Sequence, residues 1–186
     1  MHRKTKQITV SSVLIALGAV LSFVRIFELP LGGSVTLLSM LPICMISICY
    51  GNRRGLFCAM LYVLLQIMTD AGKLMGYGMT PMTWVACLLF DYIIAFGILG
   101  FSGMFRKHGT LGQCVGIAVS LVIRFVSHFI SGAFVFSAFT PEDWNVYLYS
   151  LCYNGSYMLP ELLFTMIGAV FLLRLPQIKQ LILQEK

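Results

Sequence analysis

Long apolar segments alternate with short polar or glycine- and proline-rich stretches along the whole chain. Turn-forming clusters such as Gly51-Asn-Arg-Arg-Gly55 and Thr140-Pro-Glu-Asp143 separate the segments. A helix of about 20 apolar residues is long enough to cross a bilayer. The six predicted transmembrane helices cover residues 8–27, 35–50, 55–72, 82–105, 111–138 and 153–175. The pattern predicts an all-α integral membrane protein in which residues 1–186 form a single membrane domain.

The composition agrees with a membrane protein and argues against a water-soluble globule. Of the 186 residues, 59% are hydrophobic and only 11% are charged, and the mean hydropathy is +0.88. Soluble domains carry about a quarter charged residues. The net charge of +6 is gathered in short clusters at segment ends, which is typical of contact with membrane lipid rather than with nucleic acid. The six cysteines form no Cys-x-x-Cys spacing, so we expect neither a metal site nor a cofactor.

The distribution of lysine and arginine predicts the orientation in the membrane, because loops rich in these residues stay in the cytoplasm. With the N-terminus placed inside, ten of the thirteen basic residues fall on the cytoplasmic side. These ten are Arg3, Lys4, Lys6, Arg53, Arg54, Arg106, Lys107, Arg174, Lys179 and Lys186. The outer loops then hold Lys73 and the acidic pair Glu142 and Asp143. We therefore expect six transmembrane helices with both the N- and the C-terminus in the cytoplasm.

Several polar side chains interrupt the apolar segments at similar predicted depths. At 1.5 Å of rise per residue, Asp91 lies about 13 Å, His128 about 15 Å and Glu161 about 12 Å below the outer surface. Ionisable groups at membrane depth are costly and usually face a cavity or a partner. His128, Gly132 and Phe136 follow at i, i+4 and i+8, on one face of a helix. The residues gathered in the outer half are Asp91, Tyr92, His128, Asn154, Tyr157 and Glu161, which predicts an outward-facing ligand pocket.

Structural interpretations of the same residues stay open at this point. His128 can form a hydrogen bond between helices, and Asp91 can pair with Arg124 at a comparable depth. Glu161 either contacts a ligand or pairs with Arg124. We favour the pocket, because polar side chains from three helices cluster in the same half of the membrane.

One short motif suggests an enzyme, and its predicted geometry argues against that function. Gly100-Phe-Ser102-Gly103 matches the Gly-x-Ser-Gly nucleophile motif of rhomboid intramembrane serine proteases. Ser102 lies about 20 Å or more from His128 in depth, whereas a nucleophile and its base must be within hydrogen-bond reach. An intramembrane serine hydrolase that uses Ser102 is the alternative from another class, and we expect no enzymatic activity. The sequence also lacks a P-loop motif, so ATP hydrolysis would need another protein.

Four motifs, in order along the chain, resemble the thiamine-specific S component of energy-coupling factor (ECF) transporters. They are Leu29-Pro-Leu-Gly32-Gly33-Ser34 after the first helix, Leu89-Phe-Asp91-Tyr92 in the fourth, Arg124-Phe-x-x-His128-Phe-x-x-Gly132 in the fifth and Tyr149-Ser-x-x-Tyr153-Asn154-x-x-Tyr157 entering the sixth. The resemblance covers nearly the whole chain and agrees in helix count and orientation.

The resemblance implies a multi-pass protein of the bacterial cell membrane that captures thiamine from outside with high affinity. It also implies docking on a transmembrane coupling subunit driven by two cytoplasmic ATPase subunits, and toppling in the membrane to release the vitamin. By position it implies substrate-binding roles for Asp91, Tyr92, His128, Gly132, Tyr149 and Asn154, to which we add Phe136, at the place of an expected stacking tryptophan, and Tyr157. An S component for another vitamin or for a thiamine precursor is the alternative in the same class.

The chemistry of thiamine fits these residues. Its thiazolium ring is a permanent cation, which a cavity lined by tyrosine and phenylalanine can hold by cation–π attraction of about 0.5–2 kcal/mol per ring. Its aminopyrimidine offers a donor–acceptor edge for Asp91 and Asn154 to recognise. Paired buried hydrogen bonds of this kind discriminate strongly between analogues. The loop after the first helix lacks the aromatic lid residue that some family members carry.

Small residues on the first helix predict a docking surface. Ser12, Ala16 and Val20 recur at i, i+4 and i+8, and small residues let membrane helices approach closely. The S-component family uses an Ala-x-x-x-Ala stripe on this helix to meet the coupling subunit, and the match here is partial. Internal packing of the helix is an equal alternative.

Four polar residues near segment ends are expected to cap helices. Ser34 and Thr36 precede the second predicted helix, and Asp70 and Lys73 lie at the end of the third. For Ser34 and Thr36, lining a lid over the pocket is the alternative.

Overall fold

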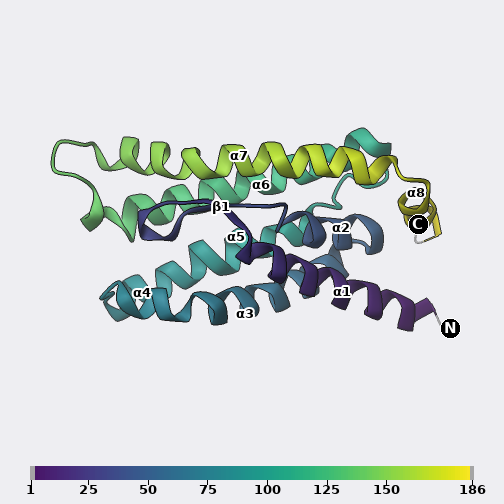
Figure 1. The fold of residues 1–186 in the computed structure, drawn as a ribbon, viewed down its shortest axis with the longest axis horizontal. Helices are drawn as coiled ribbons and strands as arrows, with labels where there is room; N and C mark the ends of the chain where they lie inside the picture. Colours follow the sequence, from purple (N-terminus) through teal and green to yellow (C-terminus); the bar gives the residue numbers. More distant parts are fainter. Residues whose placement is uncertain (1–2, 185–186) are drawn as a thin grey trace.

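Five helices of the described chain are long and apolar enough to cross a membrane, which confirms the predicted all-α membrane fold. The computed structural model describes residues 3–184, and Figure 1 shows its long helices packed beside one another. The five spans are α1 (Arg3–Phe23), α3 (Asn52–Gly76), the continuous stretch Pro81–Phe101, α6 (Gly109–Phe134) and α7 (Val146–Arg174). They share one hydrophobic core, in which Ile43, Tyr62, Leu99 and Leu121 are almost fully buried.

The prediction of a second helix over residues 35–50 is wrong for residues 35–40. Strands β1 (Arg25–Glu28) and β2 (Ser34–Thr36) pair as an antiparallel hairpin around the short 3-10 helix η1 (Pro30–Gly32), and helix α2 runs only from Leu41 to Tyr50. Gly32 has a φ of 88°, which favours glycine and lets the chain reverse before β2. The 10 residues of α2 span about 15 Å, half of a bilayer core of about 30 Å. The hairpin therefore takes the place of the outer half of this helix.

Most other predicted helices are shifted at their ends. The first ends at Phe23 instead of residue 27, because the chain enters β1. The last begins at Val146 instead of residue 153, because the Asn145 side chain accepts hydrogen bonds from the backbone N–H groups of Tyr147 and Leu148 and so caps α7. A further helix, α8 (Pro176–Gln184), follows α7 and was not predicted.

The fifth predicted helix, at residues 111–138, ends at Phe134, and the chain continues through the short 3-10 helix η4 (Ser137–Phe139). The third predicted helix is longer than expected, since α3 covers Asn52–Gly76 instead of 55–72. The predicted span 82–105 ends at Phe101 and consists of four pieces. These are α4 (Pro81–Cys87), the π-helix η2 (Leu88–Ile94), α5 (Ala95–Gly97) and the 3-10 helix η3 (Ile98–Phe101).

Helix α8 and the beginning of α1 lie at the same end of the bundle, while the connection between α6 and α7 lies at the opposite end (Figure 1). We call the latter end the outer end, following the predicted topology. The placement of this end outside the cell, with the chain ends in the cytoplasm, remains a prediction from the lysine and arginine distribution. The hairpin leads from α1 toward α2 across the middle of the bundle.

Close backbone contacts hold α2, α3 and η3 together. The Ser47 hydroxyl on α2 donates to the carbonyl oxygen of Gly100 at 2.5 Å and accepts from the N–H of Gly103 at 2.9 Å. A Cβ atom added to Gly100 would lie 2.5 Å from the Cα of Leu56 and 2.6 Å from its backbone nitrogen. Only glycine allows this approach, which follows the small-residue packing usual between membrane helices.

Gly100→Ala should therefore destabilise the protein, because the added methyl group meets backbone atoms that cannot move aside. We expect a loss of about 1–3 kcal/mol, as for other overpacked sites, measured as a lower thermal unfolding midpoint of the protein in detergent. Gly72→Ala on α3 is the matched control, since a Cβ added there would have nothing within 4 Å. Its helix should be unchanged or slightly more stable. Equal midpoints for the two variants would contradict the packing argument.

Candidate functional site

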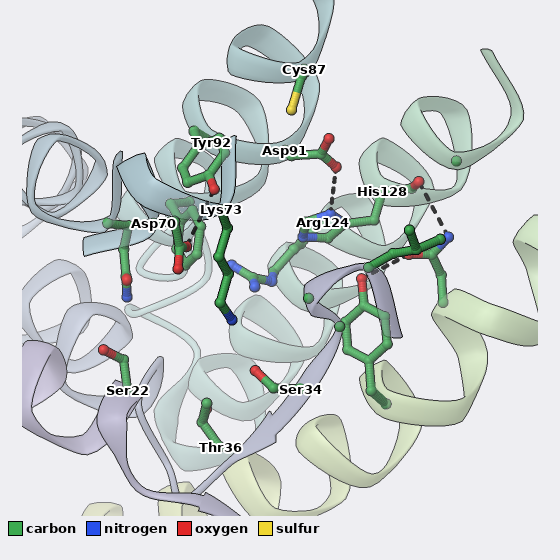
Figure 2. Close-up of a pocket in the computed structure, with 18 of the residues that line it drawn as sticks. Ser22, Ser34, Thr36, Asp70, Lys73, Cys87, Asp91, Tyr92, Arg124 and His128 are labelled. Carbon is green, nitrogen blue, oxygen red and sulfur yellow. Dashed lines mark hydrogen bonds and ion pairs between the residues drawn. The ribbon is translucent and has the colours of Figure 1, made fainter. Parts of the chain in front are cut away.

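The outer half of the bundle encloses a cavity of ≈ 170 Å³. A single water needs only about 10–15 Å³ measured this way, so the cavity has room for a larger guest. Its wall comes from the hairpin, α3, the π-helix η2, α6 and α7 (Figure 2). All eight residues predicted to bind substrate line this cavity: Asp91, Tyr92, His128, Gly132, Phe136, Tyr149, Asn154 and Tyr157.

Asp91 is the centre of a polar cluster between η2 and α6. Its Oδ1 lies 2.8 Å from Nδ1 of His128, and its Oδ2 accepts a hydrogen bond from the Ser131 hydroxyl. Figure 2 shows the Asp91 and His128 side chains facing each other from the two helices. The predicted structural alternative of an Asp91–Arg124 ion pair is therefore wrong. Nε2 of His128 is buried and has no hydrogen-bond partner among residues 3–184.

Asn154 joins α7 to α6 through hydrogen bonds within the protein. Its Nδ2 donates to the carbonyl oxygens of His128 at 3.3 Å and Ser150 at 2.9 Å, and its Oδ1 accepts from the Tyr157 hydroxyl at 2.7 Å. A Cβ on Gly132 would clash with the Ser150 hydroxyl oxygen and lie 3.0 Å from Nδ2 of Asn154. Gly132 thus makes room for α7, and the Asn154 amide is already engaged while it lines the cavity.

Aromatic rings surround the outer part of the cavity. The rings of Tyr77 and Phe136 meet edge to face with centroids 5.5 Å apart, and Tyr149, Tyr153 and Tyr157 follow one another along α7 at 6.0 and 5.9 Å. Phe136 lies beyond the last residue of α6, so the prediction that it continues the helical face of His128 and Gly132 is wrong. The turn after α6 still brings its ring to the cavity.

The hairpin forms one wall of the cavity and is tied to α7. The Tyr153 hydroxyl donates to the carbonyl oxygen of Pro30 and accepts from the N–H of Gly33 at 3.0 Å. The Thr36 hydroxyl donates to the Glu161 carboxylate. The expected helix-capping role of Ser34 and Thr36 is wrong, because α2 has Met40 as N-cap, with no side-chain cap, and both residues line the cavity instead.

On its other side the hairpin is tied to α3 by charged groups. Oε1 of Glu28 lies 2.6 Å from Nζ of Lys73 and 2.6 Å from Nη1 of Arg25. Hydrogen bonds lower the pKa of the Glu28 carboxyl group below its usual value, and the bond from Lys73 has a larger effect than the bond from Arg25. Asp70 accepts a hydrogen bond from the Tyr92 hydroxyl at 3.2 Å. Asp70 and Lys73 were expected to cap a helix, but both line the cavity. Their i, i+3 spacing is a signal that both face one side of α3.

Arg124 and Glu161 also line the cavity but make no direct ion pair with each other within residues 3–184. The guanidinium carbon of Arg124 lies 4.1 Å from the centroid of the Phe96 ring, a cation–π distance. Two of its nitrogens, Nε and Nη1, are buried and find no hydrogen-bond partner in the described chain. Glu161 accepts from Thr36 instead.

The remaining predicted residues lie away from the cavity. Ser12, Ala16 and Val20 are exposed on one side of α1, so internal packing does not explain them. Gly18, next to them in sequence, instead faces the bundle beside Ser39 and Tyr62. Ser102 is fully buried and does not line the cavity that contains His128. Ser102 is therefore separated from the cavity in which His128 lies.

Comparisons with known proteins place these features in a family. A sequence model of the family described as thiamine transporter protein (Thia_YuaJ) matches residues 8–181. The chain is 38% identical over 146 residues to the thiamine transporter ThiT of Bacillus subtilis (strain 168), which is 72% of this chain and 71% of that protein. Its fold matches the solved structure of ThiT from Listeria monocytogenes with a TM-score of 0.75 and 24% identity, over 97% of this chain and 99% of that one. This chain therefore belongs to the thiamine transporter protein family, whose members are non-enzymatic membrane proteins.

Proposed function

We propose that this protein is the thiamine-binding S component of an ECF transporter, which captures thiamine from the outer side in the cavity around Asp91. Family membership supports thiamine as the ligand. The observation that carries the proposal is the Asp91–His128 pair at the wall of a cavity lined with aromatic rings. This pair recognises the aminopyrimidine, and the aromatic rings hold the thiazolium cation.

The hydrogen-bonding capacity of the pair matches an amino group. An ionised carboxylate only accepts hydrogen bonds, so a neutral His128 donates to Asp91 through Nδ1–H and keeps Nε2 as an acceptor. This buried acceptor has no partner in residues 3–184, and an unsatisfied buried polar group is costly. The exocyclic amino group of the aminopyrimidine supplies the missing donor. Asp91 also keeps free lone pairs, because a carboxylate has about four acceptor positions.

The thiazolium ring fits the aromatic part of the cavity. The described lining includes Tyr77, Phe136, Tyr149, Tyr153 and Tyr157. A cation over such a ring gains about 0.5–2 kcal/mol. Phe136 at the position of the expected tryptophan offers a smaller ring, so the proposal assigns the cation to several rings rather than to one.

We propose that delivery of the vitamin into the cell needs partner subunits. The sequence has no P-loop motif, so ATP must be hydrolysed elsewhere, by two cytoplasmic ATPase subunits acting through a transmembrane coupling subunit. The exposed side chains of Ser12, Ala16 and Val20 form the proposed contact with the coupling subunit. Small exposed side chains allow a partner helix to approach closely.

A thiamine titration of the purified protein, followed by calorimetry, tests the ligand assignment. Saturable one-to-one binding is expected for the wild type. Asp91→Asn and His128→Ala should each weaken binding by about tenfold or more, the scale of one lost hydrogen bond to a charged or buried group. Asp143→Asn, at an exposed acidic residue of the outer loop, is the control and should bind like the wild type. Near-wild-type affinity in both cavity variants would remove the site assignment, and tighter binding of another vitamin or a precursor would identify the alternative ligand.

The amino group itself is tested with oxythiamine, in which a carbonyl oxygen replaces the pyrimidine amino group. This oxygen would face the acceptor Nε2 of His128, so we expect affinity to fall by about 100-fold or more. An analogue that keeps the aminopyrimidine and changes only the hydroxyethyl group of the thiazolium ring should lose much less. Equal affinity for thiamine and oxythiamine would show that the pair does not recognise the amino group.

The docking surface is tested by co-purification with the coupling subunit and the ATPases. Ala16→Trp should leave thiamine binding intact, because Ala16 lies outside the cavity, and should prevent assembly by steric overlap with the partner helix. Val122→Trp on α6, where the wild-type side chain is 51% exposed, is the matched control and should still assemble. An intact complex with Ala16→Trp would rule out this surface.

A further inference from the structure

Asp91 and Tyr92 lie in an unusual piece of backbone. The segment Leu88–Ile94 forms a π-helix, η2, between the α-helical turns α4 and α5. π-Helices are rare and are frequent at functional sites, and their i→i+5 pattern places an additional residue in the turn. Both Asp91 and Tyr92 line the cavity although they are neighbours in sequence. Both side chains thus reach the cavity from the π-helical turn.

Three residues of α6 contact this segment from one side. The Ser127 hydroxyl donates to the backbone carbonyl oxygen of Phe90 at 2.6 Å. The next residue, His128, meets the Asp91 carboxylate, and Ser131 donates to the same carboxylate one turn later. Ser127 is 3% exposed and Ser131 is fully buried, so water does not compete for these bonds.

Ser127 differs from the other two, because it bonds to the backbone of η2 and not to a side chain. Phe90 directly precedes Asp91, so a bond to its carbonyl group sets the position of the peptide unit that joins the two residues. The cavity lining includes His128 and Asp91 but not Ser127. Ser127 therefore does not contact a ligand in the cavity directly, and its hydroxyl group acts on the backbone of η2.

We propose that Ser127 is a positioning residue for the ligand site, which anchors the π-helix through the Phe90 carbonyl group and so orients Asp91 toward His128 and the ligand. This inference rests on the proposed function, since it assigns Asp91 to the ligand. A buried carbonyl that loses its additional donor favours another backbone arrangement, and even a small rotation of η2 would move the Asp91 carboxylate away from Nδ1 of His128.

The test compares Ser127→Ala with a matched serine on the same helix. Ser120 is also fully buried, but its hydroxyl donates to Gly116 within α6, at 3.0 Å, and does not contact η2. We expect Ser127→Ala to weaken thiamine binding by about tenfold, the scale of one hydrogen bond, whereas Ser120→Ala binds like the wild type. Ser127→Thr keeps the hydroxyl group and should restore most of the affinity.

A measurement without ligand separates this inference from the proposed function. Amide hydrogen exchange in residues 88–95 should be faster in Ser127→Ala than in the wild type or in Ser120→Ala. Wild-type affinity in Ser127→Ala, or equal losses of affinity and thermal stability in both alanine variants, would overturn the positioning role. If the wild type binds no thiamine, the proposed function fails, and unchanged exchange in Ser127→Ala would then overturn this inference as well.

Discussion

The satisfaction of polar groups at membrane depth is the constraint on which this structure depends. An ionisable group at membrane depth is costly, and it is usually paired within the protein or faces a cavity. Asp91 receives them from His128 and Ser131, both on α6. Nε2 of His128 is buried and has no hydrogen-bond partner within residues 3–184. Under the proposed function, the bonds that satisfy Asp91 also leave the His128 ring a nitrogen that a ligand with a donor can satisfy.

The hairpin obeys the same constraint. Non-helical backbone at membrane depth is tolerated where it is buried in protein or lines a cavity, and β1 and β2 satisfy much of their backbone by pairing with each other. The Tyr153 hydroxyl group accepts a hydrogen bond from the turn at Gly33. Glu161 bonds to β2 from α7, and Lys73 pairs with β1 from α3. One wall of the cavity is therefore built from non-helical backbone. The hairpin contacts α3 and α7, two of the helices that line the cavity.

Much of the site was predictable from single residues, because charge and polarity inside an apolar segment are costly and therefore informative. Asp91, His128 and Glu161 were found this way, and helical rise alone placed them at similar depths. Asp70 and Lys73 were missed, because a charged residue near a helix end has an ordinary capping explanation. Phe136 was assigned to the correct cavity for a partly wrong reason, since helical spacing does not describe the turn beyond Phe134.

The sequence by itself determined the membrane class, five of the spans and several polar residues of the cavity, such as Asp91 and His128. Hydrophobic length and buried charge are properties of each segment alone. Only the tertiary structure decided that residues 34–36 form a strand, that Leu88–Ile94 widen into a π-helix and that the Asn154 amide is engaged by α6 and Tyr157. These features depend on donors and acceptors from distant segments. No local sequence pattern indicates which of those donors and acceptors will be within hydrogen-bond reach.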